Sequence, residues 1–332
     1  MSFRSHWIRI IKYEYWPFWL FYIPAYFYYA VLAIKSKSIL YFTKLNRDMK
    51  FGGALLSSKI EILSKLPNNL IPTTIEIRDG ESFASINTKR MHQKMSFPVI
   101  AKPDNAERGK GIYKLENESE LKELVDRVKQ QTYLIQEYVS YPIELGVLVF
   151  RNKKGELTIS SMCEKSFCSV TGDGETKLGD LIQNQVRVAH RIPYFKNKYQ
   201  NEWNDVLDEG QTLVIEPIGS HNLGTKFCEA RKRINEDIYK WLDRLLSCLP
   251  LFDYGRIDMK IESWDAFKFN RGIKILEING VNAEPIHIYD SEQSIGQAYQ
   301  SIFYHMKVIF NLSQQKESKP PTLFMSFSKE LI

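Results

Sequence analysis

The feature that most constrains this chain is an uncharged aromatic run near its start. Ten of the twenty residues from Tyr15 to Ile34 are Phe, Trp or Tyr, and none of the twenty carries a charge. About 20 apolar residues are enough to cross a bilayer as a helix. A cleaved signal peptide is disfavoured, because the run is too long and too aromatic for one. The run must therefore lie against a membrane, a partner or the rest of the chain.

Three arrangements of this run stay open. A simple transmembrane helix is one, although Trp and Tyr prefer the headgroup region, and Pro17 and Pro24 interrupt a helical hydrogen-bond ladder. A segment lying on an anionic leaflet is the second and is favoured by the flanking charges. Those are Arg4, Arg9 and Lys12 before the run, and Lys35, Lys37, Lys44 and Arg47 after it. The third is an aromatic helical hairpin packed on the globular part or in a dimer interface.

The bulk composition is that of an ordinary folded protein. A chain of 332 residues suffices for two domains or one large composite unit with a sizeable core. The net charge of +6 is too small to predict nucleic-acid binding, but it suits a small polyanion or an anionic membrane. The four cysteines form no CxxC pair, so neither a zinc site nor a disulfide framework is expected, and a reducing, cytosolic environment fits best.

Beyond residue 50, hydrophobic periodicity and turn residues predict a mixture of strands and helices. Strands are expected at 75–77, 98–102, 112–115, 132–139, 143–150, 156–163, 212–216, 255–262 and 273–278. Helices are expected at 57–66, 117–131, 176–188, 232–248 and 292–311. Hairpins such as the one across the turn at Asn152–Gly155 make many strand pairs antiparallel, so the predicted fold class is α+β rather than a doubly wound sheet.

Five segments contain the residue types that phosphate and metal chemistry requires. In chain order they are Lys59 at a helix start, PVIAKPDNAERGKGIYKL with Lys102, LIQEYVSYPIE with Glu137 and Glu144, YGRIDMKI with Arg256 and Asp258, and ILEINGVNAEP with Glu277 and Asn279. Lysines neutralise phosphate charge, and glycines let backbone N–H groups approach phosphates. On each of the last two strands the two polar residues stand two positions apart and therefore share one face. Their oxygens are hard ligands of the kind Mg²⁺ takes beside nucleotide phosphates.

Each segment alone is weakly specific, but five in this order and spacing are hard to obtain by chance. From about Lys59 to Leu312, roughly three-quarters of the chain, the sequence resembles the ATP-grasp superfamily. It looks most similar to the branch of D-alanine–D-alanine ligases, glutathione synthetases and cyanophycin synthetases. The segment SVTGDGETKLGDLI at 169–182 also resembles cyanophycin-synthetase-like members.

The resemblance implies an ATP-grasp fold, in which two α+β subdomains clasp ATP. These would be residues 51–134, with a lid loop at 103–111, and residues 135–312, with the magnesium site. Residues 1–50 form the aromatic and basic helical segment, and 313–332 a tail. Family members normally carry an N-terminal domain for the first substrate. Here the aromatic segment stands in its place, so the sequence does not specify the substrate.

The resemblance also implies a role for each matching residue of the nucleotide site. Lys59 and Lys102 would contact ATP phosphates, and Lys165 would be a further phosphate or substrate contact. The remaining nucleotide-binding positions would be Gly109 and Gly111 in the lid loop, Glu137, Tyr138, Val139 and Ser140 around adenine, and Glu144 at the ribose hydroxyls. Glu107, Arg108 and Lys110 occupy lid positions where the D-alanine branch favours serines, so D-Ala–D-Ala specificity is not expected.

For catalysis, the resemblance implies two Mg²⁺ ions, with Mn²⁺ as an alternative, held by Asp258, Glu277 and Asn279. Arg256, with Lys102, would stabilise the transition state of acyl-phosphate formation. Glu284 and His287, in the segment EPIHIYD, suit a substrate contact as well as a structural role.

The implied reaction is ligation. A substrate carboxylate attacks the γ-phosphate of ATP, and an amine or another nucleophile then displaces phosphate from the acyl phosphate. Two alternatives stay open, an ATP-grasp kinase acting on a small molecule and a non-catalytic nucleotide-binding module. The expected partners are a small-molecule carboxylate and amine and a membrane surface contacted through 15–34, on the cytoplasmic side where ATP is available. No nucleic acid is expected, and the oligomeric state stays open.

Overall fold

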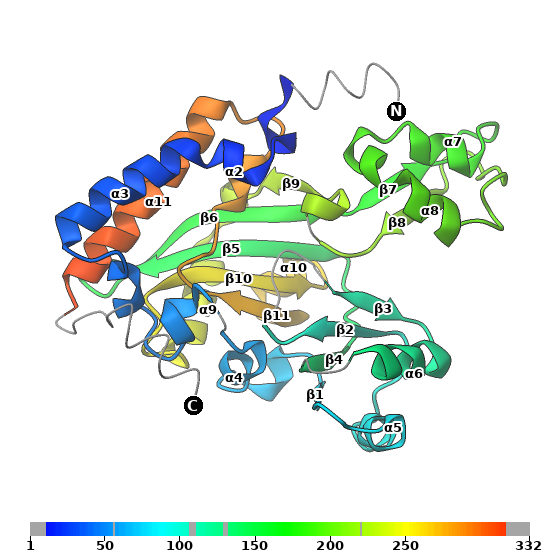
Figure 1. Cartoon of the computed structure of the whole chain (residues 1–332), viewed down its shortest axis with the longest axis horizontal. Helices are drawn as coiled ribbons and strands as arrows, with labels where there is room; N and C mark the ends of the chain where they lie inside the picture. Colours follow the sequence, from blue (N-terminus) through cyan, green and yellow to red (C-terminus); the bar gives the residue numbers. More distant parts are fainter. Residues whose placement is uncertain (1–10, 56, 106–110, 129–131, 220, 317–332) are drawn as a thin grey trace.

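The structure is a computed structural model that describes residues 11–55, 57–105, 111–128, 132–219 and 221–316. Within these ranges, helices surround two larger β-sheets, and an aromatic helical segment precedes them (Figure 1). The predicted α+β class is therefore confirmed. The expected lid residues Glu107, Arg108, Gly109 and Lys110, and residues 317–332 of the expected tail, lie outside the described ranges.

A four-stranded antiparallel sheet carries the first part of the site. Its strand order is β1 (Thr74–Ile77), β4 (Tyr133–Glu137), β2 (Val99–Pro103) and β3 (Tyr113–Leu115). Val99 and Ala101 of β2 pack with buried residues of α5 (Phe83–His92) and α6 (Glu118–Arg127). Because side chains alternate along a strand, Lys102 lies on the opposite face, away from these helices.

A five-stranded antiparallel sheet carries the second part. Its strand order is β11 (Ile273–Asn279), β10 (Tyr254–Ile261), β5 (Ile143–Arg151), β6 (Leu157–Ser166) and β9 (Lys226–Glu229). The amphipathic helix α9 (Glu236–Ser247) buries Trp241 and Leu245 in the same core as Val147 and Met259 of the sheet. The other face carries Glu144 of β5 and the alternating polar residues Arg256, Asp258 and Lys260 of β10.

Smaller elements complete the fold. Strands β7 (Cys168–Thr171) and β8 (Thr212–Glu216) pair and share a core with α7 (Leu178–Gln183) and α8 (Ile192–Lys198). Helices α4 (Lys59–Leu63) and α10 (Trp264–Lys268) flank the five-stranded sheet. All nine expected strands have a counterpart, but β7, β9, α5, α8 and α10 were not predicted. The expected helix at 176–188 was wrong in extent, because α7 ends at Gln183 and a short 3-10 helix begins at Val186.

The aromatic run folds into two helices that pack on the last one. They are α2 (Phe18–Phe21) and α3 (Ile23–Ser36), and α3 lies beside α11 (Ile295–Gln314) (Figure 1). Pro17 and Pro24 interrupt neither helix. Pro17 immediately precedes α2, and Pro24 stands in the first turn of α3, where a missing N–H costs nothing. Among the described residues, no helix combines the length and hydropathy that a bilayer crossing requires.

Glycines fit the loop after Phe51 tightly against the end of β11. The backbone N–H of Val281 donates to the Gly52 carbonyl oxygen at 3.0 Å. A Cβ atom on Gly280 would lie 2.3 Å from that oxygen and 2.6 Å from the Gly53 Cα. This contact fixes the chain directly after Asn279, one of the predicted metal ligands.

We therefore expect Gly280→Ala to lower the free energy of unfolding by about 1–3 kcal/mol, because the new methyl group overlaps rigid backbone. Urea denaturation followed by tryptophan fluorescence measures this change. Gly296→Ala in α11 is the matched control, since the nearest atom to its Cβ would be 3.9 Å away. It should leave stability unchanged or raise it by about 0.4–1 kcal/mol. Equal stabilities of the two variants would contradict the tight packing.

Candidate functional site

A cavity of about 610 Å³ is lined by both larger sheets and by the N-terminal aromatic segment. The four-stranded sheet contributes Lys102 and Glu137, and the five-stranded sheet contributes Glu144, Asp258 and Glu277. The chain therefore brings together residues that lie up to 175 positions apart, as the sequence predicted for the five segments.

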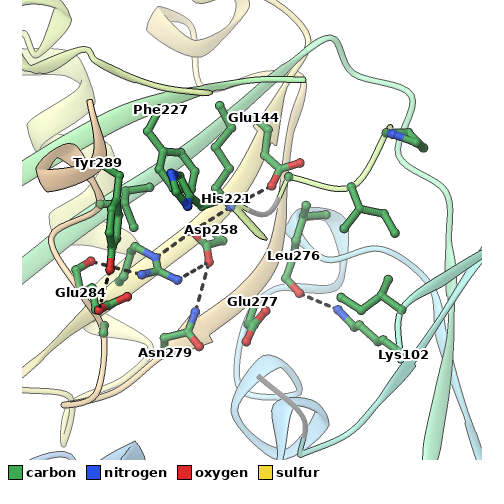
Figure 2. A pocket seen from close by; sticks show the side chains of 18 of the residues that line it. Lys102, Glu144, His221, Phe227, Asp258, Leu276, Glu277, Asn279, Glu284 and Tyr289 are labelled. Atoms are coloured by element: carbon green, nitrogen blue, oxygen red, sulfur yellow. Dashed lines mark hydrogen bonds and ion pairs between the residues drawn. The ribbon is translucent and has the colours of Figure 1, made fainter. Parts of the chain in front are cut away.

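Lys102 connects the two sheets across this cavity. Its buried Nζ donates to the Gln136 Oε1 of β4 at 2.9 Å. It also donates to the Leu276 carbonyl oxygen of β11 at 3.0 Å (Figure 2). Burial, only partly offset by the nearby Glu277 carboxylate, lowers the pKa of Lys102 to about 8. Gln136 was not predicted, although the alternation in LIQEYV places it on the same face as the cavity.

Lys59 reaches the site through Glu277. The Lys59 Nζ lies 3.5 Å from the Glu277 Oε1 and donates to the Asp104 carbonyl oxygen at 3.3 Å. The Asp104 side chain accepts from the backbone N–H groups of Lys59 and Ile60, which holds the start of α4 against the end of β2. Both predicted lysines thus lie near the Glu277 carboxylate.

The centre of the site is the Asp258 carboxylate. Arg256 donates two hydrogen bonds to it, from Nε at 3.0 Å and from Nη2 at 3.1 Å (Figure 2). The Asn279 Nδ2 donates to it at 3.1 Å, and the Lys165 Nζ lies 3.4 Å away. Strand register produces this cluster, because Arg256 stands opposite Asn279, and Asp258 opposite Glu277, on β10 and β11.

The charges in this cluster hold one another in the ionised state. Burial alone raises the pKa of Asp258, but Arg256 and Lys165 outweigh burial and lower that pKa to about 2. Burial by itself lowers the pKa of Lys165, whereas Asp258 and Glu144 raise it above its ordinary value. Arg256 likewise has a raised pKa, because Asp258 overcomes the effect of burial. The cluster therefore keeps fixed charges at neutral pH.

Glu144 and Lys165 form a buried ion pair next to Asp258. The Lys165 Nζ donates to the Glu144 Oε1 at 2.9 Å (Figure 2). A Cβ atom on Gly219 would lie 2.4 Å from that oxygen, so the segment 217–219 closes directly over the pair. The structure therefore groups Glu144, the predicted ribose residue, with Lys165.

The expected adenine residues lie at the end of β4. Glu137, Tyr138 and Val139 line the cavity, whereas Ser140 is exposed. The Glu137 Oε2 accepts from the Thr73 backbone N–H at 3.1 Å. Gly111, at the base of the expected lid, has a φ of +71°, a conformation that glycine adopts readily.

Lys260 is a buried residue of the site that the sequence analysis did not select. Its Nζ donates to the Val139 carbonyl oxygen at 2.9 Å and lies over the rings of Tyr138 and Phe167. The signal was present, because Lys260 continues the period-2 spacing of Arg256 and Asp258 along β10.

The N-terminal segment, together with Phe227 of β9 and Tyr289, forms a second part of the cavity wall. This wall is aromatic and is lined by Tyr13, Tyr15, Trp16, Phe18, Phe21, Phe227 and Tyr289. The buried carboxylate of Glu14 accepts from the Arg187 Nη2 at 2.8 Å, and the His221 ring stacks on Tyr289 with centroids 4.9 Å apart. The sequence analysis predicted neither the aromatic part of this wall nor the contact between Glu14 and Arg187. Its signal was the acidic Glu14 beside an aromatic run.

Glu284 and His287 have different environments. Glu284 lines the cavity, and its carboxylate accepts from the hydroxyls of Tyr22 and Tyr289. Its backbone carbonyl oxygen accepts from the Arg256 Nη1. His287 is buried between β6 and α11, where its two ring nitrogens contact the hydroxyls of Ser161 at 2.8 Å and Ser301 at 2.9 Å. Burial lowers the pKa of His287, which fits a neutral ring that links these elements.

Oxygen donors suited to a hard divalent cation gather where β10 and β11 meet. Asp258 and Glu277 supply carboxylates, and the Asn279 carboxamide keeps its oxygen for a ligand because it donates through Nδ2. Within the part of the chain that the structure describes, no group of three or more His, Cys, Asp or Glu side chains converges on one point. The predicted set differs from such a group, because it contains two acids and an amide.

Residues 73–170 match the sequence model of the ATP-grasp domain. The resemblance to the ATP-grasp superfamily is thereby confirmed. The matched segment contains Lys102, Glu137, Glu144 and Lys165, whereas Arg256, Asp258, Glu277 and Asn279 lie beyond it. A comparison with curated protein sequences found no match.

Several solved structures are similar in fold. D-alanine–D-alanine ligase from Bacillus anthracis is 14% identical with a TM-score of 0.45, covering 80% of this chain and 69% of that one. Carboxyaminoimidazole ribonucleotide synthase from Aspergillus clavatus, complexed with ATP, is 13% identical with a TM-score of 0.40, covering 69% and 45%. D-cycloserine synthetase is 12% identical with a TM-score of 0.42, covering 76% and 70%. The chain thus spans less than half of the fungal synthase.

The lowered pKa of Asp258 predicts a dependence of stability on pH. Its pKa is about 2 in the folded protein against 3.8 when unperturbed, so its stabilisation is complete above about pH 5 and is lost as the pH falls towards 2. The difference in unfolding free energy between wild type and Asp258→Asn should therefore be about 2 kcal/mol smaller at pH 2 than at pH 6. Urea denaturation across this range measures the difference.

A surface carboxylate supplies the control for this measurement. Asp265→Asn, on exposed α10, should leave stability close to that of wild type throughout. A difference between wild type and Asp258→Asn that stays constant with pH would contradict the ion-pair interpretation.

Proposed function

We propose that this protein is an ATP-dependent ligase that joins a carboxylate to an amine or another nucleophile through an acyl phosphate. The observation that carries the proposal is the Asp258 cluster, in which Arg256, Lys165 and Asn279 surround one ionised carboxylate beside Glu277. This arrangement faces a cavity that also contains Lys102 and the end of β4. The ATP-grasp match at 73–170 supports the nucleotide part of the proposal.

The cavity divides into a nucleotide half and an acceptor half. In the proposed function, Glu137, Tyr138 and Val139 surround adenine, with Ser140 following at the exposed edge, and Glu144 contacts the ribose. Lys59, Lys102 and Lys165 neutralise phosphate charge, and Gly111 stands at the end of the proposed lid loop 103–111. Asp258, Glu277 and Asn279 would hold two Mg²⁺ ions, or Mn²⁺, whose charge would screen the phosphate oxygens.

Arg256 is the residue proposed to stabilise the phosphoryl group during its transfer. Its Nε and Nη2 are held by Asp258, and its Nη1 donates to the Glu284 carbonyl oxygen at 3.2 Å, so the guanidinium is fixed before any substrate arrives. A fixed cation stabilises charge that develops on a transferred phosphoryl group without the cost of reorganising. Arg256 thus favours attack by the substrate carboxylate, and Lys102 assists from the opposite wall.

The acceptor half supports a substrate that lies close to a membrane. Aromatic side chains of the N-terminal segment offer apolar contact there, beside the polar groups of Glu14, Arg187, His221 and Glu284, which suit a polar headgroup. In this proposal the protein works at the cytoplasmic face, where ATP is available.

Products distinguish the ligase from its alternatives. The wild type should release ADP and inorganic phosphate only when both a carboxylate and an amine are present, and Asp258→Asn should reduce this rate by about a hundredfold or more. Phosphate release and ADP formation are measured together in a substrate screen, with chelator and with added Mg²⁺. Lys268→Gln, on the surface of α10, is the control and should keep full activity.

Two outcomes of this screen would contradict the ligase. A phosphorylated product without free phosphate would indicate a kinase. ATP binding without turnover of any candidate, unchanged by Asp258→Asn, would indicate a non-catalytic nucleotide-binding module.

The lowered pKa of Lys102 makes nucleotide binding sensitive to pH. Lys102 loses its proton as the pH rises through about 8, so the affinity for a non-hydrolysable ATP analogue should fall by about tenfold between pH 7 and pH 9.5. Isothermal titration calorimetry measures this affinity. Lys102→Arg keeps its charge and should abolish the fall. The same pH dependence in both proteins would assign the effect to another group.

A further inference from the structure

Helices α2 and α3 present an apolar face to solvent. Trp19, Ile23, Phe27, Val31 and Ile34 follow a helical spacing of three and four residues and are all exposed. Trp19 is 63% exposed, Phe27 73% and Ile34 77%, values that a folded protein rarely gives to neighbouring large apolar side chains. We call these five residues the outer face.

The opposite side of the same helices is buried. Phe21 and Ala25 share a core with Ile288, Ala298 and Ile302. The Tyr299 hydroxyl donates to the Phe21 carbonyl oxygen at 2.9 Å. The outer face is therefore held on the outside of the molecule by packing on its other side, with α3 lying along α11 (Figure 1).

The net positive charge of the chain falls within its first 47 residues. Residues 1–47 contain seven Lys and Arg residues and one acidic residue, Glu14. In the rest of the chain 38 basic and 38 acidic residues balance, so residues 1–47 account for the whole net charge of +6. Lys12 precedes α2, and Lys35 and Lys37 follow the outer face, all three exposed. Glu14 is buried against Arg187. An apolar face with cations at both ends is complementary to an anionic lipid surface.

Three alternatives fit less well. A second copy of the chain would bring two segments of like charge together, which opposes a self-complementary contact. A transmembrane arrangement would need both sides of α3 free, whereas one side belongs to the protein core. The segment 317–332 contains both Lys and Glu and offers no excess of acidic residues to pair with this face.

We propose that the outer face docks on an anionic lipid surface, with α2 and α3 lying in the plane of the interface. Trp19 and Tyr26 suit the headgroup level, and Phe27 and Ile34 the acyl boundary beneath it. Docking does not depend on the reaction catalysed.

The same helix α2 connects this surface to the cavity. Phe18 lines the cavity and is also 38% exposed, next to Trp19 and Leu20 on the outside. The aromatic wall of the acceptor half therefore begins where the docking face begins. If the proposed ligase function holds, a substrate carrying an apolar chain reaches the cavity from the lipid surface without crossing open water.

Vesicle flotation with the full-length protein tests the docking. The protein should float with vesicles of equal parts phosphatidylglycerol and phosphatidylcholine, and much less with pure phosphatidylcholine or in high salt. Phe27→Asp/Ile34→Asp should lower the partition coefficient by about tenfold or more. Lys35→Glu/Lys37→Glu, which leaves the packing untouched, should cause a similar loss on anionic vesicles alone. Met91→Asp, on exposed α5 far from α3 (Figure 1), should bind like wild type.

The results separate docking from catalysis. Circular dichroism and ATP turnover with a water-soluble substrate are measured on every variant. Lost flotation with unchanged turnover supports the docking face, and absent turnover with intact flotation counts against the ligase alone. The proposal is overturned if wild type shows no preference for anionic vesicles, or if the charge-reversed variant binds them equally well. It is also overturned if size exclusion shows a dimer that Phe27→Asp/Ile34→Asp dissociates while wild type ignores vesicles.

Discussion

A carboxylate removed from water must be compensated by the groups around it, and the site of this protein is organised around one such carboxylate. Asp258 is 5% exposed and is surrounded by Arg256, Lys165 and Asn279. Loss of one partner of a buried ion pair typically costs about 3–5 kcal/mol, because the remaining charge is left without compensation. The register of β10 against β11 and of β5 against β6 is what brings these partners to Asp258. A one-residue slip in either pair would separate them.

Two lysines extend this organisation to the four-stranded sheet. Lys102 bonds to Gln136 in its own sheet and to the Leu276 carbonyl oxygen in the other. Lys59 meets Glu277 from the start of α4. The residues expected to neutralise phosphate thus also hold the two sheets at their present separation. A nucleotide that recruits these lysines would have to replace the bonds they now make.

The sequence predicted the strands of the site well and its surroundings poorly, for physical reasons. Asp258, Glu277 and Asn279 alternate along strands, and alternation is a local property that determines which face a side chain occupies. Gln136 and Lys260 obey the same rule and could have been found by extending it. In contrast, Arg187 meets Glu14 across 173 positions, a contact that no local period encodes. The short elements β7, β9 and α8 are likewise stabilised mainly by tertiary packing rather than by their own pattern.

The aromatic segment was understood least from its sequence, because its two sides serve different environments. Composition alone indicated an apolar partner, and the structure shows that one partner is α11. This has a practical consequence for anyone who shortens the protein to ease its handling. Residues 48–332 carry no net formal charge, so a protein without the first 47 residues would lack the electrostatic repulsion that keeps proteins dispersed. It would also uncover Ala298 and Ile302 and open the cavity on one side. Such a truncation would make the molecule more prone to aggregation and would remove the aromatic wall of its proposed substrate site.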